Sequence, residues 1–439
     1  MKTSEDSLES LLEKRLRELA GKQEKSELIT IPRIPCDILE GNGIYYEPRV
    51  VSIGPYYHGM DKYRDTEQHK LQYLRDFLSR HQVRLDVLVK EMRALQVQAR
   101  QCYSGYIRLD REQFVEMLLL DGCFVLEVLS KKLNKENDAL RDISWVLNRI
   151  VTDFLLLENQ IPFFVIHKLY SISCMGNEWS DSILHHFTDF VQWRAPMWVW
   201  PRQFEIPQCE IHHLLHFYQE FHVPNKTKFS IITVQSSMVK KQEDPVYMMP
   251  SATDLRDAGI IFQTKKFPAH FLDITFKNGV FEMPMIATSL DEKIIILNLI
   301  AWNAMFSSEA TKQSDNSNYL SPLSSYTILL ESLVRAKTDV QLLKACGIIE
   351  NNDPSDEQVA SFFNHLGDLN VISGESHYFA ELFRDIKRYH DGRWHRHRAK
   401  LIRDYFHSPW SSISVVAGII LLVLTGIQTF FTVDPVAHH

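Results

Sequence analysis

The sequence predicts a mainly α (α+β) protein, in which a helix-rich globular domain with a small antiparallel β-sheet is followed by one C-terminal transmembrane helix. Two long runs, 111–133 and 143–170, are apolar on nearly every side, which is typical of helices at the centre of a domain. Residues 271–287 form two short apolar segments around an Asn-Gly pair, which is typical of a β-hairpin. The stretch from Ile413 to Val433 is uncharged and predominantly apolar, as a membrane span requires.

Composition favours one large domain. The chain is 45% hydrophobic and 23% charged, enough to bury a substantial core, and no Gly/Ser or Pro-rich linker divides its middle. The net charge of −7 argues against nucleic acid as a partner. The six cysteines form no CxxC pair and are expected to be reduced. The expected organisation is an N-terminal amphipathic helix over 1–27, the helix-rich domain over 28–404, a membrane anchor over 405–433 with its spanning core at 413–433, and a short tail over 434–439.

Leucines, prolines and glycines predict the structure of the first 60 or so residues. Leucines at helical spacing predict the amphipathic helix within 1–27, and the prolines of IPRIPC predict extended backbone after it. Val50 to Ile53 is expected to form a short strand that runs into a Gly-Pro turn. Gly54 and Gly59 have the spacing of a phosphate-binding loop, but Met-Asp follows where that loop needs Lys and Ser or Thr, which argues against nucleotide binding.

Helical periodicity then organises the N-terminal half of the domain. Gly122 should let a neighbouring helix approach closely, and Pro162 should start a new helix or kink the one it lies in. The expected helices are 66–80, 85–102, 111–133 and the run 143–170.

Capping and turn signals organise the C-terminal half. Ser251, with Asp254 three residues later, is a helix N-terminal capping signal. Asn278 and Gly279 should form the hairpin turn. Further helices are expected over 292–306, over 320–335 and within 353–366, where Asp, Pro and Ser precede an apolar face.

The run Ile413 to Val433 has the length of a membrane span. At about 1.5 Å per residue it extends roughly 31 Å, close to the ~30 Å hydrocarbon core of a bilayer. Ser414 and Gly418 form a small-xxx-small pair through which the chain could form a homo-oligomer. The predicted anchor residues are Ile413, Val415, Val416, Ile419, Ile420, Leu421, Leu422, Val423, Leu424, Ile427, Phe430, Phe431 and Val433.

Charge around this run predicts its orientation. Residues 384–403 are rich in Lys and Arg, whereas the tail after Val433 has neither. Because positive charge stays on the cytoplasmic side, residues 1 to about 410 are expected in the cytosol, most simply at the plasma membrane. The alternative is that the large domain lies outside the cell, which would agree with the N-glycosylation sequon at Asn225. The candidate contacts with lipid headgroups are Arg393, Arg396, Arg398, Lys400 and Arg403.

Acidic residues interrupt the two central apolar runs. Buried carboxylates can act as paired acid and base or bind metal ions, since burial raises their pKa values. They can also bind backbone N–H groups or Arg side chains and so fix helix packing. The sequence favours this structural role, because no Glu-x-x-His motif stands beside them. The residues concerned are Glu116, Asp121, Glu127, Asp153 and Glu158.

Histidines cluster at His212, His213 and His216. Two imidazoles one helical turn apart can hold a metal ion. No HExxH motif accompanies them, so packing or surface histidines are the favoured interpretation, and no metal or cofactor is predicted.

Several segments in order carry a family resemblance. They are IPRIP, YEPRVVSIGPYYHG, the ExxK of EQHK, EMLLLDGCFVLEVL, DFLLLENQIPFFV, SATDLRDAGIIF and the terminal apolar run, and they span about residues 28 to 433. This pattern resembles the plant "domain of unknown function" family number 247, also described as uncharacterised protein family 0481. The resemblance implies membrane-anchored plant proteins without an established enzymatic chemistry. Some grass members are proposed as self-incompatibility determinants, which implies a recognition or signalling role.

The expected function is therefore that of a single-pass, C-terminally anchored membrane protein that acts as an interaction, recognition or signalling module. The expected partners are the lipid bilayer and an unidentified protein. The alternative is a membrane-tethered enzyme that uses the buried carboxylates or the histidine cluster. No GxSxG, GxGxxG, GK[ST], CxxC or HExxH motif occurs, so the prediction is that the protein is not an enzyme.

Overall fold

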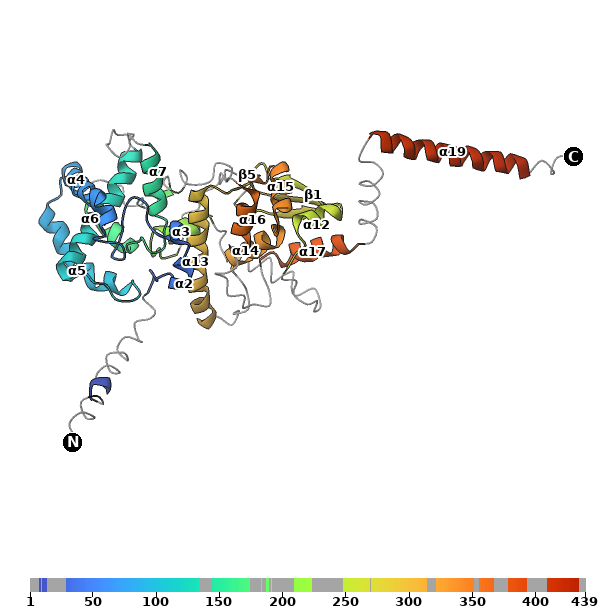
Figure 1. The fold of residues 1–439 in the computed structure, drawn as a ribbon. Coiled ribbons are helices and arrows are strands. Elements are labelled where there is room, and N and C mark those ends of the chain that lie inside the picture. The colour runs from blue at the N-terminus through green and yellow to red at the C-terminus, as the bar shows by residue number, and fades with distance from the viewer. Residues whose placement is uncertain are drawn as a thin grey trace.

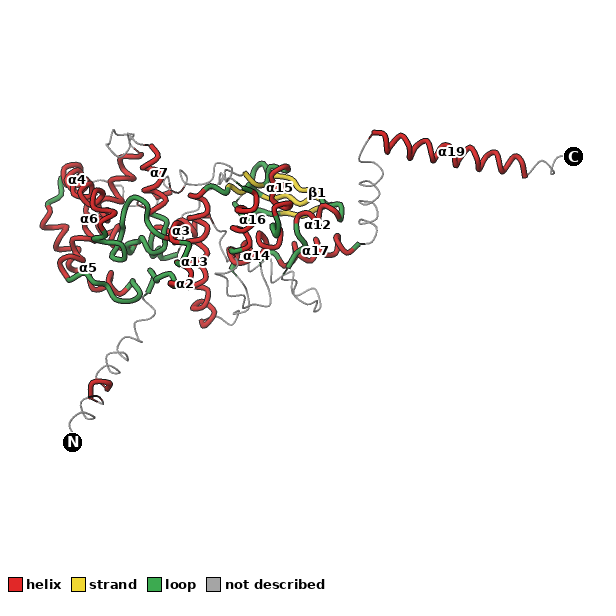
Figure 2. The backbone as a smooth tube through the Cα atoms, viewed as in Figure 1, coloured by secondary structure: helices red, strands yellow, loops and turns green. Residues whose placement is uncertain are grey.

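The structure is a computed structural model in which helices dominate, and the strands of its described residues all lie in the C-terminal half (Figures 1 and 2). The long helix α13 (Leu290–Gln313) stands between an N-terminal helical half and the C-terminal half (Figure 1). The structure describes residues 8, 10–13, 29–133, 144–173, 183, 187–188, 191, 209–222, 248–268, 270–313, 321–350, 355–366, 378–392 and 409–433. Of the predicted N-terminal helix, residues 8 and 10–13 are helical, and the rest lies outside the described residues.

The N-terminal half is built around α6, whose two apolar faces are both covered. Helices α4, α5 and α8 all pack on α6, and Phe114, Leu118 and Phe124 on it are fully buried. The predicted helices 66–80, 85–102 and 111–133 are confirmed within one to two residues. The elements of this half are α2 (Cys36–Leu39), α3 (Gly43–Tyr46), η2 (Asp61–Tyr63), α4 (Arg64–His81), α5 (Leu85–Gln101), α6 (Arg111–Leu133), α7 (Ser144–Asp153), α8 (Phe163–Ser173) and α10 (Leu214–His222).

Of the two alternatives predicted for Pro162, the start of a new helix is confirmed and the kink is wrong, because α7 ends at Asp153 and α8 begins at Phe163, directly after Pro162. Between them the Gln160 amide donates to the carbonyls of Phe154 and Leu156, which holds a non-helical turn. The predicted strand Val50 to Ile53 is extended but pairs with no other strand among the described residues, because side chains occupy its backbone donors.

The C-terminal half contains the sheet, in the order β1-β3-β2. The hairpin of β2 and β3 is confirmed, and Asn278 and Gly279 turn it with φ of 53° and 79°. The sheet is not purely antiparallel, because β1 pairs with β3 in parallel. A parallel partner needs a long connection, and residues 265–279 supply it. The strands are β1 (Ile261–Thr264), β2 (Thr275–Lys277), β3 (Val280–Met283), β4 (Ile286–Ala287) and β5 (Ile349–Glu350), and β4 pairs with β5 in a second, parallel sheet.

Helices surround these strands, and serine caps start several of them. The Ser251 side chain accepts the N–H of Asp254, as the capping signal predicts, and Ser321 and Ser355 cap two further helices in the same way. The two helices over 337–345 and 380–391 were not predicted from the sequence. The helices are α12 (Ala252–Asp257), α14 (Pro322–Leu333), α15 (Lys337–Ala345), α16 (Asp356–Asn364) and α17 (Ala380–Asp391).

The predicted fold class is wrong in its transmembrane helix. The last helix, α19 (Pro409–Val433), lies apart from both halves (Figure 1). A membrane span needs about 20 consecutive apolar residues. Among the described residues, no helix combines the length and the apolar character needed to cross a membrane.

The packing of α6 on α8 depends on Gly122. A Cβ placed on Gly122 would lie 2.3 Å from Leu169 Cδ1 of α8. We expect Gly122→Ala to lower the free energy of unfolding by about 1 to 3 kcal/mol, because the tight contact forces side chains off their rotamers. Urea unfolding followed by circular dichroism measures this. Gly426→Ala, at a helical glycine with no atom within 4 Å, is the matched control and should leave the unfolding midpoint unchanged.

Candidate functional site

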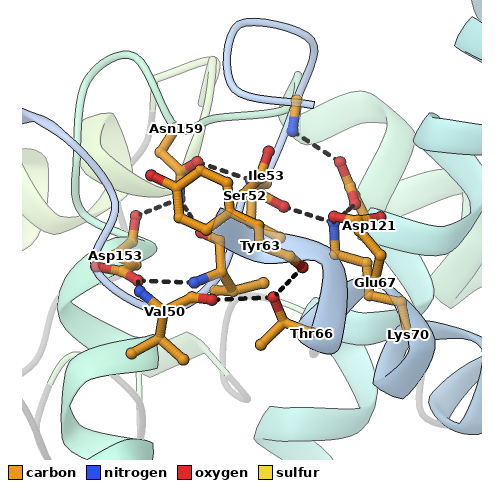
Figure 3. A network of polar contacts seen from close by, with 12 residues as sticks. Val50, Ser52, Ile53, Tyr63, Thr66, Glu67, Lys70, Asp121, Asp153 and Asn159 are labelled. Atoms are coloured by element: carbon orange, nitrogen blue, oxygen red, sulfur yellow. Dashed lines mark hydrogen bonds and ion pairs between the residues drawn. The ribbon is translucent and has the colours of Figure 1, made fainter. Parts of the chain in front are cut away.

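The extended segment 49–54 is held by side chains instead of by a strand (Figure 3). Asp153, the last residue of α7, accepts the backbone N–H groups of Arg49, Val50 and Val51 at 3.0, 2.7 and 3.0 Å. The Asn159 amide accepts the N–H of Ile53 at 2.7 Å and donates to the carbonyl of Val51 at 3.1 Å. These bonds take the place of a β-ladder. Burial raises the pKa of Asp153 to about 6, and the three N–H donors oppose this rise.

A buried ion pair continues the same network. The Lys70 ammonium lies 2.5 Å from Asp121 Oδ1 and 2.6 Å from Glu67, and it also donates to the carbonyl of Ser52 at 2.5 Å. Asp121 Oδ2 accepts the N–H of Gly54 at 2.7 Å. Gly54 has φ of 80°, and a Cβ there would lie 2.3 Å from the carbonyl oxygen of Gln160. The close approach of the Gln160 backbone therefore explains why residue 54 is a glycine. Phosphate binding is not needed to explain it.

The other predicted acids lie in separate surroundings. Glu158 accepts the N–H of Ile34 at 2.6 Å, the guanidinium of Arg33 at 3.1 Å and the hydroxyl of Tyr57 at 3.0 Å. Glu127 pairs with the Arg80 side chain at 3.1 Å. Glu116 is exposed. Each of these buried acids therefore binds groups of its own chain. No two of them bind the same group in the part of the chain that the structure describes, so they do not form the carboxylate pair that acid–base catalysis would use.

The predicted histidine cluster is also bonded internally. His213 is buried against the Trp302 ring, with centroids 4.3 Å apart, and its Nδ1 accepts the N–H of His216. Cys209, His216 and Glu220 bring their ligand atoms within 4.8 Å of one another. However, His216 Nδ1 accepts the N–H of His212 at 3.2 Å, which leaves the ring proton on Nε2, the nitrogen that faces Glu220 at 3.6 Å. That these histidines hold no metal ion stays a prediction.

An apolar cavity of about 110 Å³ lies beside α13. It is walled by residues of α10, α13, α14, α16 and β4. His222, the last residue of α10, lines it, and its Nε2 atom has no hydrogen-bond partner in the described part of the chain. Burial lowers the pKa of His222 to about 3.

A larger, charged cleft of about 760 Å³ opens between the start of α12, the loop before α15 and the end of α17. Its acidic groups are Asp254, Asp257 and Asp391, and its basic groups are Arg335 and Lys387. The Arg335 guanidinium donates to the carbonyl of Met249 at 2.7 Å and so anchors one wall. Met248, which is 63% exposed, and His390 complete the rim.

The predicted anchor and lipid-contact residues take no part in these sites. In α19 the side chains of Ile413, Ile427 and 420–424 are exposed. The predicted anchor side chains Val415, Val416, Ile419, Phe430, Phe431 and Val433 and the predicted lipid contacts Arg393, Arg396, Arg398, Lys400 and Arg403 lie outside the described residues.

Sequence reasoning predicted that Asp121 and Asp153 bind backbone N–H groups, but it missed Lys70 in the network and the grouping of residues in the cleft. Lys70 had a usable signal, because it shares a helical face with the buried Thr66, Tyr73 and Phe77. A lysine on an apolar face predicts a buried partner acid. The cleft had no such signal, since Asp254, Arg335 and Lys387 come from three distant parts of the chain.

Comparison with known proteins identifies relatives without a described activity. A family described as plant protein of unknown function, DUF247, matches residues 31–424. A UPF0481 protein of Arabidopsis thaliana is 28% identical over 439 aligned residues, which cover 94% of this chain and 87% of the relative. A second Arabidopsis UPF0481 protein is 22% identical, over 92% of this chain and 90% of the relative. No solved structure matches the chain.

The network predicts that Asp153 contributes strongly to the free energy of unfolding. We expect Asp153→Ala to lower the free energy of unfolding by about 3 kcal/mol or more, because buried N–H groups lose their acceptor. Asp153→Asn, which keeps one carbonyl oxygen, should cost less. Urea unfolding at pH 7 measures both. Glu116→Ala, at an exposed acid, is the control and should change the value by no more than about 0.5 kcal/mol. Equal effects at Asp153 and Glu116 would contradict the assigned role.

The buried His222 predicts acid sensitivity. Its folded pKa, about 3, lies below that of an unfolded histidine, about 6.5. The stability it contributes is therefore present above about pH 6.5 and is lost as pH falls toward 3. Between about pH 5.5 and 4 the unfolding free energy of the native chain should fall with decreasing pH more steeply than that of His222→Phe. We expect the two slopes to differ by up to about 1.4 kcal/mol per pH unit. Parallel curves for the two proteins would show that His222 protonates freely when folded.

Proposed function

Because the chain belongs to the DUF247 family of plant proteins of unknown function, we propose its role from its own surface: it is a protein-interaction module that binds an extended segment of a partner protein in the charged cleft. The observation that carries this proposal is the cleft itself, whose 760 Å³ falls within the roughly 300–1,000 Å³ of typical binding sites. A recognition or signalling role, which the family resemblance suggests, would use such a surface.

The side chains of the cleft suit a peptide segment better than a small apolar ligand. Acidic groups of α12 face the same hollow as Arg335 and Lys387, so a partner segment that carries both signs of charge finds a complement. Met248 adds an exposed, flexible thioether, a side chain that adapts to different partner surfaces. Carbonyls and N–H groups of an extended segment would satisfy the polar walls.

The enzymatic alternative has less support. The acids on which it depends, such as Asp153 and Glu158, bind backbone N–H groups, and the histidine cluster is bonded internally. In the described residues these acids line neither the cleft nor the apolar cavity. A cytosolic position for the domain, expected from the basic segment 384–403, stays a prediction.

Selection from a displayed peptide library against the purified full-length chain tests the proposal. We expect enriched peptides that carry both a basic and an acidic residue. Lys387→Glu should weaken their binding by about tenfold, since it reverses a charge in the cleft. Binding is measured by fluorescence anisotropy.

The matched control is Lys90→Glu, the same charge reversal at an exposed lysine of α5. It should leave the dissociation constant unchanged within about twofold. A library that yields no enriched peptide, or peptides that bind Lys387→Glu as well as the native chain, would exclude the cleft as the contact site.

A further inference from the structure

We propose that the apolar cavity beside α13 is a binding site for a small apolar molecule that carries one hydroxyl group. This site is independent of the charged cleft, because the two hollows have no lining residue in common. Failure of one proposal therefore leaves the other untouched.

The size and walls of the cavity set the body of the ligand. The cavity measures about 110 Å³, and apolar side chains such as Ile295, Leu299 and Leu323 make most of its wall. An apolar cavity of about 150 Å³ in another protein stays free of water and binds benzene. A single ring or a short branched chain therefore matches this volume.

His222 sets the polar group of the ligand. Its side chain is buried, and Nε2 has no hydrogen-bond partner among the described residues. The ring is held in place by Tyr218 and Phe221, with centroids 4.4 and 5.5 Å away. A buried polar atom without a partner costs free energy that a bound group can recover.

A hydroxyl is the group that fits this nitrogen best. Because burial lowers the pKa of His222 to about 3, its ring is neutral at cellular pH. In a neutral ring one nitrogen donates and the other accepts. A hydroxyl both donates and accepts, so it pairs with Nε2 in either tautomer.

A charged ligand is disfavoured, although Lys293 and Glu292 also line the cavity. The Lys293 ammonium lies over the Phe362 ring at 5.1 Å, and the Glu292 carboxylate is hydrogen-bonded to the Ser289 hydroxyl at the start of α13. An additional anion would have to leave water for mostly apolar walls. The neutral imidazole offers no charge to compensate for this.

Titration of the full-length protein with phenol, benzene and benzoate tests the proposal. Binding is followed by ligand-detected nuclear magnetic resonance. We expect phenol to bind about three to ten times more tightly than benzene, because only phenol bonds His222. Benzoate should bind more weakly than phenol.

Two histidine variants identify the nitrogen responsible. His222→Phe keeps an aromatic ring but removes the nitrogen, and it should bind phenol and benzene equally. His213→Phe is the matched control, because His213 is also buried, has an Nε2 without a partner among the described residues, and does not line the cavity. It should keep the preference for phenol.

Three results would overturn the proposal. Absence of saturable binding by phenol and benzene would mean that the cavity holds water or nothing. A phenol preference that survives in His222→Phe would place the hydroxyl elsewhere. Tighter binding of benzoate than of phenol would make Lys293, and not His222, the group that selects the ligand.

Discussion

The fold depends on one requirement: the backbone N–H groups of an extended segment buried among helices must find acceptors. Segment 49–54 has no neighbouring strand in the described part of the chain, and Asp153, Asn159 and Asp121 accept its donors instead. These acceptors come from α6, from the end of α7 and from the turn after it. The segment therefore joins the central helices together, and Lys70 brings α4 into the same network.

This requirement explains two of the acids that interrupt the most apolar runs of the chain, Asp121 and Asp153. A buried carboxylate is costly unless it is fully hydrogen-bonded, and three backbone donors supply that compensation at Asp153. The same requirement explains Gly54, where any side chain would meet the backbone of Gln160. The most conspicuous polar residues of the sequence thus build the fold, and the groups available for binding lie elsewhere.

The two hollows available for binding differ in physical character and in origin. The cavity beside α13 forms where α10 and α13 of the helical centre meet α14 and α16, so its walls are mostly apolar core side chains, with His222, Glu292 and Lys293 as the polar groups. The cleft forms at the far side of the sheet half, where helix ends bring charged side chains together. The first suits a small neutral ligand and the second suits a polar peptide.

What the sequence determined by itself is what depends on neighbours along the chain. Helical periodicity predicted α4, α5 and α6, the Ser251 cap predicted the start of α12, and the Asn278–Gly279 pair predicted the hairpin, because each signal acts within one turn or one strand pair. Tertiary structure alone decided that Val50 to Ile53 bonds to side chains and not to a strand, and that β1 joins the sheet in parallel. It also decided which polar residues meet in a hollow. Asp254, Arg335 and Lys387 share the cleft, and His222 and Leu323 both line the cavity, because contacts between segments far apart in sequence bring them together, and no local pattern predicts such contacts.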